Sequence, residues 1–441
     1  MAATPDTADP RAARFRDELH RTVVESLDLS RIDRWSPERV RTEVKALAEK
    51  MAPRVDRSLS KSSVDGATNE VIDEVFGLGP IEPYLQDPKV TEILVNGPDQ
   101  VYVERFGRLQ KVDARFVDAG HLTRVIQRIA SRVGRRIDES SPMVDARLPD
   151  GSRVNAVLPP LTPDAPTLAI RRFGAGMTAD ELVKLNSVPA PVLKFLQQCV
   201  AGKVNIVVSG GTGAGKTTLL NILSASIPAN ERVVTIEDTA ELKLQQPHVV
   251  RMESRNVNLE GKGGVGTREL LRNSLRMRPD RIIVGECRGP EVIDMLQAMN
   301  TGHEGSLTTV HANDTRDALK RLEMMLGLAG FEVPVHVMRA YIASAVQLIV
   351  HVSRLAGGER KLTRISELRG LSRRHRYIVR DLFSFEQRGV DEGRAYGAFQ
   401  VFGHKPEKLL AQLESAGILV PNDTFRAREF DSNSNIFLED K

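Results

Sequence analysis

The clearest chemical signature in the sequence is an eight-residue stretch that fits the pattern G-x-x-x-x-G-K-[ST]. Glycines lack a Cβ and let the backbone curl so that several N–H groups turn towards an anion. In this pattern a lysine reaches the β- and γ-phosphates of a nucleotide, and a threonine hydroxyl binds Mg²⁺. The stretch therefore predicts a nucleoside triphosphate site, with Lys216 as a catalytic residue and Thr217 as a metal ligand. The predicted nucleotide-binding residues are Gly210, Gly211, Thr212, Gly213, Ala214, Gly215, Lys216, Thr217 and Thr218.

The elements around this stretch are the ones that the motif requires. Residues 204–209 form an apolar, strand-like run, and residues 218–223 have a helical apolar pattern. A strand, a glycine-rich loop and a helix in that order place the positive end of the helix at the anion. This context favours nucleotide binding over a glycine-rich turn without a ligand, and it implies ATP and Mg²⁺ as cofactors.

Two acidic residues follow apolar strands further along the chain. Glu237 ends the run 233–236, and Glu286 follows residues 281–285, which end in Gly285. Open α/β sheets place their sites at the carboxyl ends of strands. There Glu237 could deprotonate the attacking water, and Glu286 could hold Mg²⁺ through water. Two alternative interpretations remain open. Glu237 could be an acidic helix cap, and Glu286 could be an ordinary charged residue at a strand end, since the usual acid at that position is Asp.

A third stretch carries two histidines, His303 and His311, on either side of a strand of small residues. They are candidate catalytic residues that could sense the γ-phosphate or signal its loss. His303 and Glu304 do not continue to H-E-x-x-H, because position 307 is Leu, which excludes a zinc protease. Residues 261–266 match G-x-G-x-x-G, but no apolar strand precedes them, so a loop beside the nucleotide is expected rather than a dinucleotide site.

The overall composition is that of a soluble globular protein. The 441 residues are 41% hydrophobic and 27% charged, and Lys+Arg 62 against Asp+Glu 58 leave a net charge of +4. This balance implies no strong affinity for polyanions. Cys199 and Cys287 are the only two cysteines, too few for a four-cysteine zinc site and suited to a reducing compartment. No secretion signal and no apolar run of roughly 20 residues is present. We expect a cytoplasmic protein that meets the membrane peripherally, through partners.

The pattern of elements predicts an α/β protein of several parts. Strand-like and helix-like runs alternate after residue 204, which indicates a parallel sheet covered on both faces. Before it, short strands and one amphipathic helix indicate an α+β domain. The expected parts are a helical and partly disordered segment, that α+β domain, a linker, an ATPase core and a C-terminal appendage: 1–65, 66–173, 174–177, 178–375 and 376–441.

The order of these motifs resembles the ATPases of type II and type IV secretion. In that superfamily's terms they are Walker A, the Asp box at 236–242, Walker B at 276–288 and the His box at 301–313. The resemblance is closest to the CpaF (TadA-type) ATPases of tight-adherence pili and runs from about residue 66 to 415. Residues 295–303 and 145–155 carry it most specifically. The missing four-cysteine element favours the CpaF or type IV secretion branch.

The resemblance implies a homohexameric ring, with each nucleotide between a PAS-like N-terminal domain and a RecA-like P-loop NTPase domain. It implies Glu237 as general base, Glu286 acting through Mg²⁺, and N-terminal arginines that close on the phosphates. The arginines at those positions could equally form surface ion pairs, and which of them contacts nucleotide stays open. They are Arg147 and Arg153, expected to be catalytic, and Arg171 and Arg172, expected to bind nucleotide.

The function implied is a pilus motor that works through inner-membrane platform proteins and so acts on pilin indirectly. Pilus retraction by the same motor stays open, and so does a type IV secretion ATPase that moves protein or DNA. A RecA-like helicase would need aromatic stacking residues, but aromatic residues make up only 5% of the chain, so no direct nucleic-acid partner is expected. A regulator without turnover conflicts with the presence of both Glu237 and Glu286.

Overall fold

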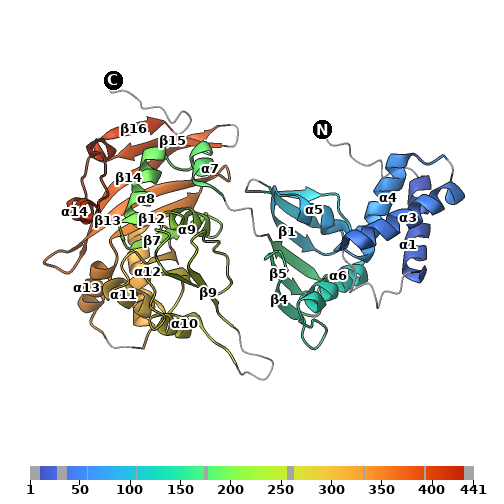
Figure 1. Cartoon of the computed structure of the whole chain (residues 1–441), viewed down its shortest axis with the longest axis horizontal. Coiled ribbons are helices and arrows are strands. Elements are labelled where there is room, and N and C mark those ends of the chain that lie inside the picture. The colour runs from blue at the N-terminus through green and yellow to red at the C-terminus, as the bar shows by residue number, and fades with distance from the viewer. Residues whose placement is uncertain are drawn as a thin grey trace. The chain divides into compact units, whose positions relative to one another are not determined.

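The computed structural model of the chain divides into two compact units, Met1–Gly174 and Ala175–Lys441 (Figure 1). Each unit is described below by itself. The structure describes residues 10–26, 37–56, 58–105, 107–172, 177–255, 263–330, 333–391 and 394–431.

The first unit begins with three helices that share one apolar core. They are α1 (Pro10–Ser26), α3 (Pro37–Val55) and α4 (Lys61–Val75). Apolar residues recur every three or four positions in each helix, so each presents one stripe to the other two. The predicted boundary between residues 65 and 66 is wrong, because it falls inside α4. The second half of α4 contributes Ala67, Val71 and Ile72 to the same core as Phe15 and Val44.

An antiparallel sheet of six strands follows, in the order β3-β2-β1-β6-β5-β4. One face packs on α6 (Ala119–Arg132), whose Leu122, Val125, Ile126 and Ile129 are buried. The other face carries the alternate, more exposed residues of the strands. The α+β architecture is therefore confirmed, whereas the PAS-like assignment stays a prediction. The remaining elements are η1 (Gly79–Ile81), α5 (Glu82–Gln86), β1 (Val90–Asn96), β2 (Val101–Arg105), β3 (Arg108–Val112), β4 (Met143–Arg147), β5 (Arg153–Val157) and β6 (Thr167–Arg171).

The second unit is built on a sheet of ten strands, in the order β16-β15-β14-β13-β12-β7-β11-β10-β8-β9. The six strands from β12 to β9 in this order pair in parallel. The sequence had predicted the inner strands but not β9, an edge strand whose apolar residues are interrupted by charged ones. The parallel strands are β7 (Ile206–Gly210), β8 (Val233–Glu237), β9 (Val249–Glu253), β10 (Arg281–Cys287), β11 (Leu307–His311) and β12 (Leu348–Arg354).

Helices cover both faces of this sheet, as an α/β architecture requires. One buried cluster joins α8 and α9 to one face, and a second joins α11, α12 and α13 to the other. The predicted α/β class is thus confirmed for this unit. The helices are α7 (Ala179–Lys184), α8 (Ala190–Ala201), α9 (Lys216–Ser224), α10 (Thr267–Ser274), α11 (Val292–Asn300), α12 (Thr315–Gly327), α13 (Val335–Ala345), α14 (Glu407–Ser415) and η2 (Asn422–Phe425).

The C-terminal strands extend the same sheet in antiparallel fashion (Figure 1). They are β13 (Arg360–Leu371), β14 (Tyr377–Asp391), β15 (Arg394–Val401) and β16 (Arg428–Asp431). β13 and β14 form one long hairpin, in which Leu371 lies opposite Tyr377. The predicted division between residues 375 and 376 is wrong, because it falls in the turn of that hairpin. The expected disordered tail after residue 431 lies outside the described residues.

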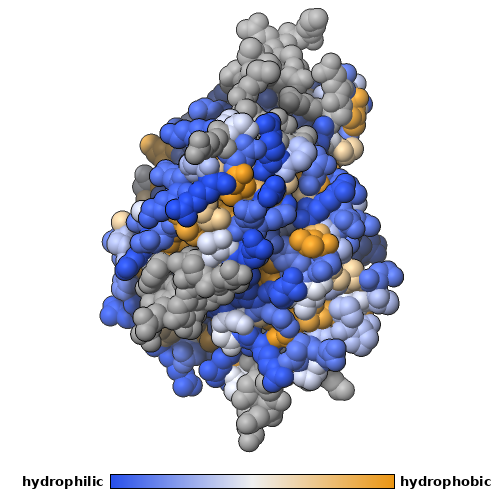
Figure 2. Space-filling view, turned by 90° about the vertical axis from the view of Figure 1, so that its right-hand side faces the viewer, coloured by the Kyte–Doolittle hydropathy of each residue, from blue (hydrophilic) through white to orange (hydrophobic). Residues whose placement is uncertain are grey.

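No helix in the described ranges is long and apolar enough to cross a membrane. On the face drawn in Figure 2, hydrophobic residues form small separate groups among hydrophilic ones. Scattered apolar residues of this kind are ordinary on a protein surface. This face therefore presents no broad apolar area.

Candidate nucleotide site

The glycine-rich stretch forms the loop between β7 and α9, as its pattern predicted. All five residues of β7 are buried, and α9 begins at Lys216. Gly213 has φ 68° and Gly215, the N-cap of α9, has φ 97°. These left-handed conformations are strained for residues with a Cβ, so the loop requires glycine at both positions. The backbone N–H groups at the start of α9 provide an anion site.

The Lys216 ammonium lies over this loop. Its Nζ donates to the carbonyl oxygens of Gly210 at 3.1 Å and of Gly211 at 3.0 Å. The same atom lies 3.4 Å from Nδ1 of His311. Lysine is a flexible cation with three donors, so these contacts hold it beside the loop that would receive the phosphates.

The carboxyl ends of four parallel strands converge on the loop. His311, at the end of β11, lies opposite Gly210 at the end of β7. β10, which carries Glu286, pairs with β11 on one side and with β8, which ends in Glu237, on the other. The structure therefore brings together Lys216, His311, Glu286 and Glu237, at the edge where open α/β sheets bind ligands.

Glu237 is the most unusual acid of this group. Its side chain is only 4% exposed. Oε1 accepts hydrogen bonds from the backbone N–H groups of Glu241 at 2.8 Å and Leu242 at 3.0 Å. Oε2 is buried and has no hydrogen-bond partner within the described ranges. Burial raises the pKa of Glu237 to about 7, although the two N–H donors oppose the shift. A carboxylate with a pKa near neutrality is suited to accept a proton.

Gly285 makes room for that carboxylate. A Cβ at position 285 would stand 2.9 Å from Cγ of Glu237, closer than real side chains approach. The Gly285 carbonyl is held by the Thr309 hydroxyl at 2.7 Å. The glycine before Glu286 is therefore explained by the side chain on the neighbouring strand, which the sequence alone did not reveal.

Glu286 lies between a cation and a histidine. Its Oε2 accepts a hydrogen bond from Nη2 of Arg288 at 2.9 Å, and its Oε1 lies 3.6 Å from Nδ1 of His311. Nη1 of Arg288 also lies 3.9 Å from Oδ2 of Asp238. Arg288 thus neutralises two acids that would otherwise repel each other, and a bound Mg²⁺ would compete with it for Glu286.

His311 connects the loop to Glu286. Its Nε2 lies 3.2 Å from Oγ1 of Thr212, and its Nδ1 faces both Lys216 and Glu286. A neutral ring protonated at Nε2 would donate to Thr212 and accept from Lys216. Protonation at Nδ1 would instead favour Glu286. The structure therefore brings His311 to the loop, where its two ring nitrogens face Thr212, Lys216 and Glu286, and its catalytic role stays a prediction.

The residues fit Mg²⁺ bound together with a nucleotide rather than a metal bound by protein alone. Across the described ranges, no group of three or more His, Cys, Asp or Glu side chains could hold a metal ion. Mg²⁺ in nucleotide sites uses one or two protein oxygens, with phosphates and water completing its shell. The partly exposed Thr217 at the start of α9 and Glu286 are the residues that would supply them.

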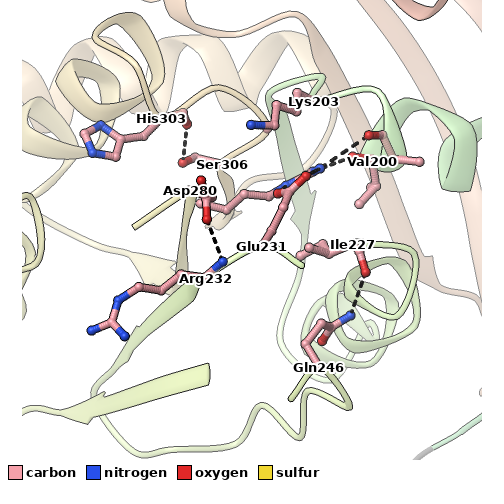
Figure 3. Close-up of polar contacts among 12 residues, drawn as sticks. Val200, Lys203, Ile227, Glu231, Arg232, Gln246, Asp280, His303 and Ser306 are labelled. Atoms are coloured by element: carbon pink, nitrogen blue, oxygen red, sulfur yellow. Dashed lines mark hydrogen bonds and ion pairs between the residues drawn. The ribbon is translucent and has the colours of Figure 1, made fainter. Parts of the chain in front are cut away.

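His303 lies at the other end of β11. The turn that precedes this strand holds His303, whose carbonyl accepts from the Ser306 hydroxyl at 2.7 Å. About 13 Å of strand separates the two ends of β11. Figure 3 shows the imidazole of His303 pointing away from Lys203 and Glu231. The structure therefore does not bring His303 to the loop, because two histidines that flank one strand lie at opposite edges of the sheet, and its catalytic role stays a prediction.

Three of the four predicted arginines form a row across the first unit's sheet. Arg147 on β4 lies opposite Arg153 on β5, which lies opposite Arg171 on β6. Nε of Arg171 lies 3.9 Å from Oε1 of Glu92, and Nε of Arg147 donates to the Gly151 carbonyl at 3.3 Å. Like charges directly opposite on neighbouring strands repel each other. The row therefore concentrates positive charge on this face of the sheet.

Arg172 does not belong to this row. Its Nη1 donates to the carbonyl oxygens of Asp87 and of Val90, the latter at 3.2 Å, and its backbone N–H donates to the Thr91 carbonyl. The guanidinium thus ties the end of β6 to the start of β1. Its side chain is engaged with the backbone of the first unit, and nucleotide binding by Arg172 stays a prediction.

Two further arginines contact the site and were not predicted. Arg288 follows Glu286 by two residues within the Walker B stretch, so its nearness to Glu286 could have been inferred. Arg360, from β13, donates from Nε to the Gly213 carbonyl at 2.8 Å. Nothing local in the sequence signals this contact, because it depends on the pairing of β12 with β7.

The whole sequence between residues 74 and 396 matches one family model, described as Type II/IV secretion system protein. A Mycobacterium tuberculosis protein provisionally named as a conjugal transfer protein is 39% identical over 303 residues, covering 67% of this chain and 86% of the relative. The type IV secretion system protein VirB11 of Bartonella quintana is 32% identical over 328 residues, covering 66% of this chain and 92% of that protein.

Among solved structures, the VirB11 ATPase of the Brucella suis type IV secretion system, in complex with sulphate, is 29% identical. The alignment covers 67% of this chain and 97% of the VirB11 chain, with a TM-score of 0.37.

Proposed function

The chain belongs to the type II/IV secretion system protein family, and from that premise we propose that it is an ATPase motor. Its relatives include proteins named as type IV secretion and conjugal transfer proteins, and one of them is named as an ATPase. The observation that carries the proposal is the junction of the phosphate loop with Lys216, Glu286 and the buried Glu237 at one sheet edge. ATP and Mg²⁺ are the proposed cofactors.

The loop and the start of α9 would bind the phosphates. Lys216 would exchange its loop carbonyls for the β- and γ-phosphate oxygens, since charged acceptors are stronger partners than carbonyls. Mg²⁺, held by Thr217 and through water by Glu286, would neutralise charge on the phosphates. The ion pair between Arg288 and Glu286 would then break, whereas Arg288 would stay close to Asp238.

Glu237 would act as general base. The backbone N–H groups of Glu241 and Leu242 fix its Oε1, which leaves Oε2 as the atom that accepts a proton from the attacking water. Because its pKa lies near 7, it can hold that proton and release it again at neutral pH.

The arginine row of the first unit would close on the γ-phosphate. Arg147, Arg153 and Arg171 would supply charge where it builds up in the transition state, as arginine fingers do. An anion would relieve the repulsion within the row.

We infer two candidate tasks for the motor at the cytoplasmic face of the membrane. The sequence motifs favour assembly of a tight-adherence pilus through inner-membrane platform proteins, with pilin moved indirectly. The names of the relatives favour type IV secretion of protein or DNA. The helices α1 and α3 lie before the family match and could adapt the motor to its own platform.

The assembly state and task can be tested together. Mass photometry of the full chain with a non-hydrolysable ATP analogue should detect a species of six chains, and phosphate release should not respond to DNA. A monomer with DNA-stimulated turnover would contradict the motor and favour a helicase. In cells, replacing the protein with its Lys216→Ala variant should abolish surface filaments. Intact filaments with loss of conjugal or protein transfer would instead assign the secretion task.

A further inference from the structure

The hairpin between β12 and β13 brings two arginines to the phosphate loop. β12 pairs in parallel with β7, and Val352 lies opposite Gly210 (Figure 1). Arg354 ends β12, and Arg360 begins β13 directly opposite it. Nε of Arg360 donates to the Gly213 carbonyl at 2.8 Å, and a Cβ at Gly213 would stand 3.7 Å from Nη1 of Arg354. Both arginines lie far from the loop in sequence.

The contact of Arg360 fixes a peptide group whose orientation decides how the loop binds anions. The carbonyl of Gly213 and the N–H of Ala214 belong to one planar trans peptide, so they point in opposite directions. Holding the carbonyl towards Arg360 aims the Ala214 N–H the other way. That N–H lies 3.4 Å from the Gly211 carbonyl oxygen, a long hydrogen bond that a charged acceptor could replace.

The loop resists reversal of this peptide on one side only weakly. Reversal rotates ψ of Gly213 and φ of Ala214, and Gly213 has no Cβ to oppose the rotation on its side. A reversed peptide would turn a carbonyl oxygen towards the phosphates and repel them. The stem of Arg360 also packs on the loop, since a Cβ at Gly215 would stand 3.5 Å from its Cδ.

The hairpin that carries Arg360 is itself firmly held. Leu355 donates to the Glu359 carbonyl at 2.8 Å, and Gly358 donates to the Leu355 carbonyl at 2.8 Å. Oε2 of Glu359 accepts from the backbone N–H of Ala395, in β15, at 2.9 Å. A functional side chain on a rigid support keeps its geometry better than one on an unsupported loop.

We propose that Arg360 is a positioning residue for nucleotide binding, which acts by holding the Gly213 carbonyl away from the phosphates. The proposal rests on the proposed nucleotide site and adds a residue from the C-terminal sheet to it. Through Glu359 and Ala395, the same contact joins the phosphate loop to β15, so the state of the nucleotide is mechanically connected to the antiparallel half of the sheet.

The test compares three replacements in the full chain. Arg360→Met keeps length without a donor or charge, Arg360→Gln keeps a neutral donor, and Arg360→Lys keeps the charge. Arg364→Met is the matched control, because Arg364 lies on the same strand and pairs with Asp381 at 2.9 Å. The readouts are the Kd of a fluorescent ATP analogue with Mg²⁺, KM and kcat for phosphate release, and thermal unfolding.

Arg360→Met should raise the Kd of the analogue about tenfold to a hundredfold, which is the range for losing a hydrogen bond to a charged group. KM should rise by a similar factor with a smaller change in kcat, because the bound state and the transition state lose the contact alike. Arg360→Gln should recover part of the affinity, and the Arg364→Met control should bind as the wild type does.

Two outcomes would overturn the proposal. One is wild-type affinity in a folded Arg360→Met variant. The other is a loss of affinity in Arg364→Met as large as that in Arg360→Met, since removal of any arginine from this strand would then explain the effect. These results are separable from failure of the motor proposal. A wild-type chain that binds the analogue in an Arg360-dependent way but releases no phosphate would refute the motor and leave the positioning role intact.

Discussion

Replacing Glu237 with Gln should make the protein more stable at alkaline pH while removing its hydrolysis. The carboxyl group is buried, and one of its oxygens lacks a partner in the described part of the chain. Its pKa is raised from 4.5 to about 7, mainly by burial. Between those two pH values the folded state binds more protons at this site than the unfolded state does. The free energy of unfolding therefore falls as pH rises from 4.5 to about 7, and stays lower above it.

The size of this effect follows from the pKa shift. From 4.5 to about 7 is 2.5 units, and at 1.36 kcal/mol per unit the charged carboxylate costs about 3 kcal/mol of folding free energy. Glutamine has the same shape and carries no charge, so it avoids this cost. Its amide nitrogen lacks a partner where Oε2 lay, but that penalty does not depend on pH. The quantity to compare is therefore the change with pH in the difference between variant and wild type.

The assay is thermal unfolding without nucleotide at pH 5 and pH 8.5. For a unit of this size, about 3 kcal/mol corresponds to a shift of roughly 5 to 10 °C in the melting temperature of the second unit. The melting temperature of Glu237→Gln minus that of the wild type should be larger at pH 8.5 than at pH 5 by roughly 5 to 10 °C. Glu253→Gln is the control, because Glu253 is exposed on the neighbouring strand opposite Glu237. It should show no such dependence.

A difference between Glu237→Gln and wild type that stays constant from pH 5 to pH 8.5 would refute the reasoning. It would mean that the carboxylate is solvated in the folded state and its pKa is ordinary. The general base proposed here also requires wild-type kcat/KM to rise about tenfold per pH unit below pH 7 and to level off above it.

Three further substitutions test separate parts of the account. Gly285→Ala should lower phosphate release at least tenfold with nucleotide binding retained, because its Cβ would stand 2.9 Å from Cγ of Glu237; unchanged turnover would show that the carboxylate position is not critical. Glu231→Ala should lower the free energy of unfolding by about 3 to 5 kcal/mol in urea titrations, because the fully buried guanidinium of Arg281 loses its carboxylate partner. A decrease of less than about 1 kcal/mol would contradict this. Arg172→Ala should lower the melting temperature of the first unit and leave the Kd for nucleotide within about twofold of the wild-type value. A large loss of affinity would instead show that Arg172 binds nucleotide.

The nucleotide loop could be predicted because its information is local. A strand, a glycine-rich loop and a helix follow one another in the chain, and the loop's chemistry depends on residue types at fixed spacing. Glu237, Glu286 and His311 were also placed correctly, since carboxyl ends of parallel strands share one edge. For the same geometric reason His303 lies at the opposite edge of the sheet, because it precedes the strand that His311 ends.

The features that were missed depend on pairing across the sheets. Arg360 reaches the loop only because β12 lies beside β7, a register that no local pattern encodes. The two wrong boundaries have the same origin. α4 continues across the first because its second half packs on α1, and the β13–β14 hairpin crosses the second. Arg172 was assigned through the family resemblance, and its contacts with the Asp87 and Val90 carbonyls depend on the pairing of β6 with β1, which no local pattern encodes.

The most direct test of the account separates binding from chemistry in two variants of the full chain. Binding of a fluorescent ATP analogue and release of phosphate from Mg–ATP should be measured on wild type, Lys216→Ala and Glu237→Gln. The account predicts that the wild type does both, that Lys216→Ala loses both, and that Glu237→Gln binds the analogue as well as the wild type but releases almost no phosphate. Phosphate release by Glu237→Gln at the wild-type rate would contradict the assignment of the base, and release by Lys216→Ala at the wild-type rate would contradict the nucleotide site itself.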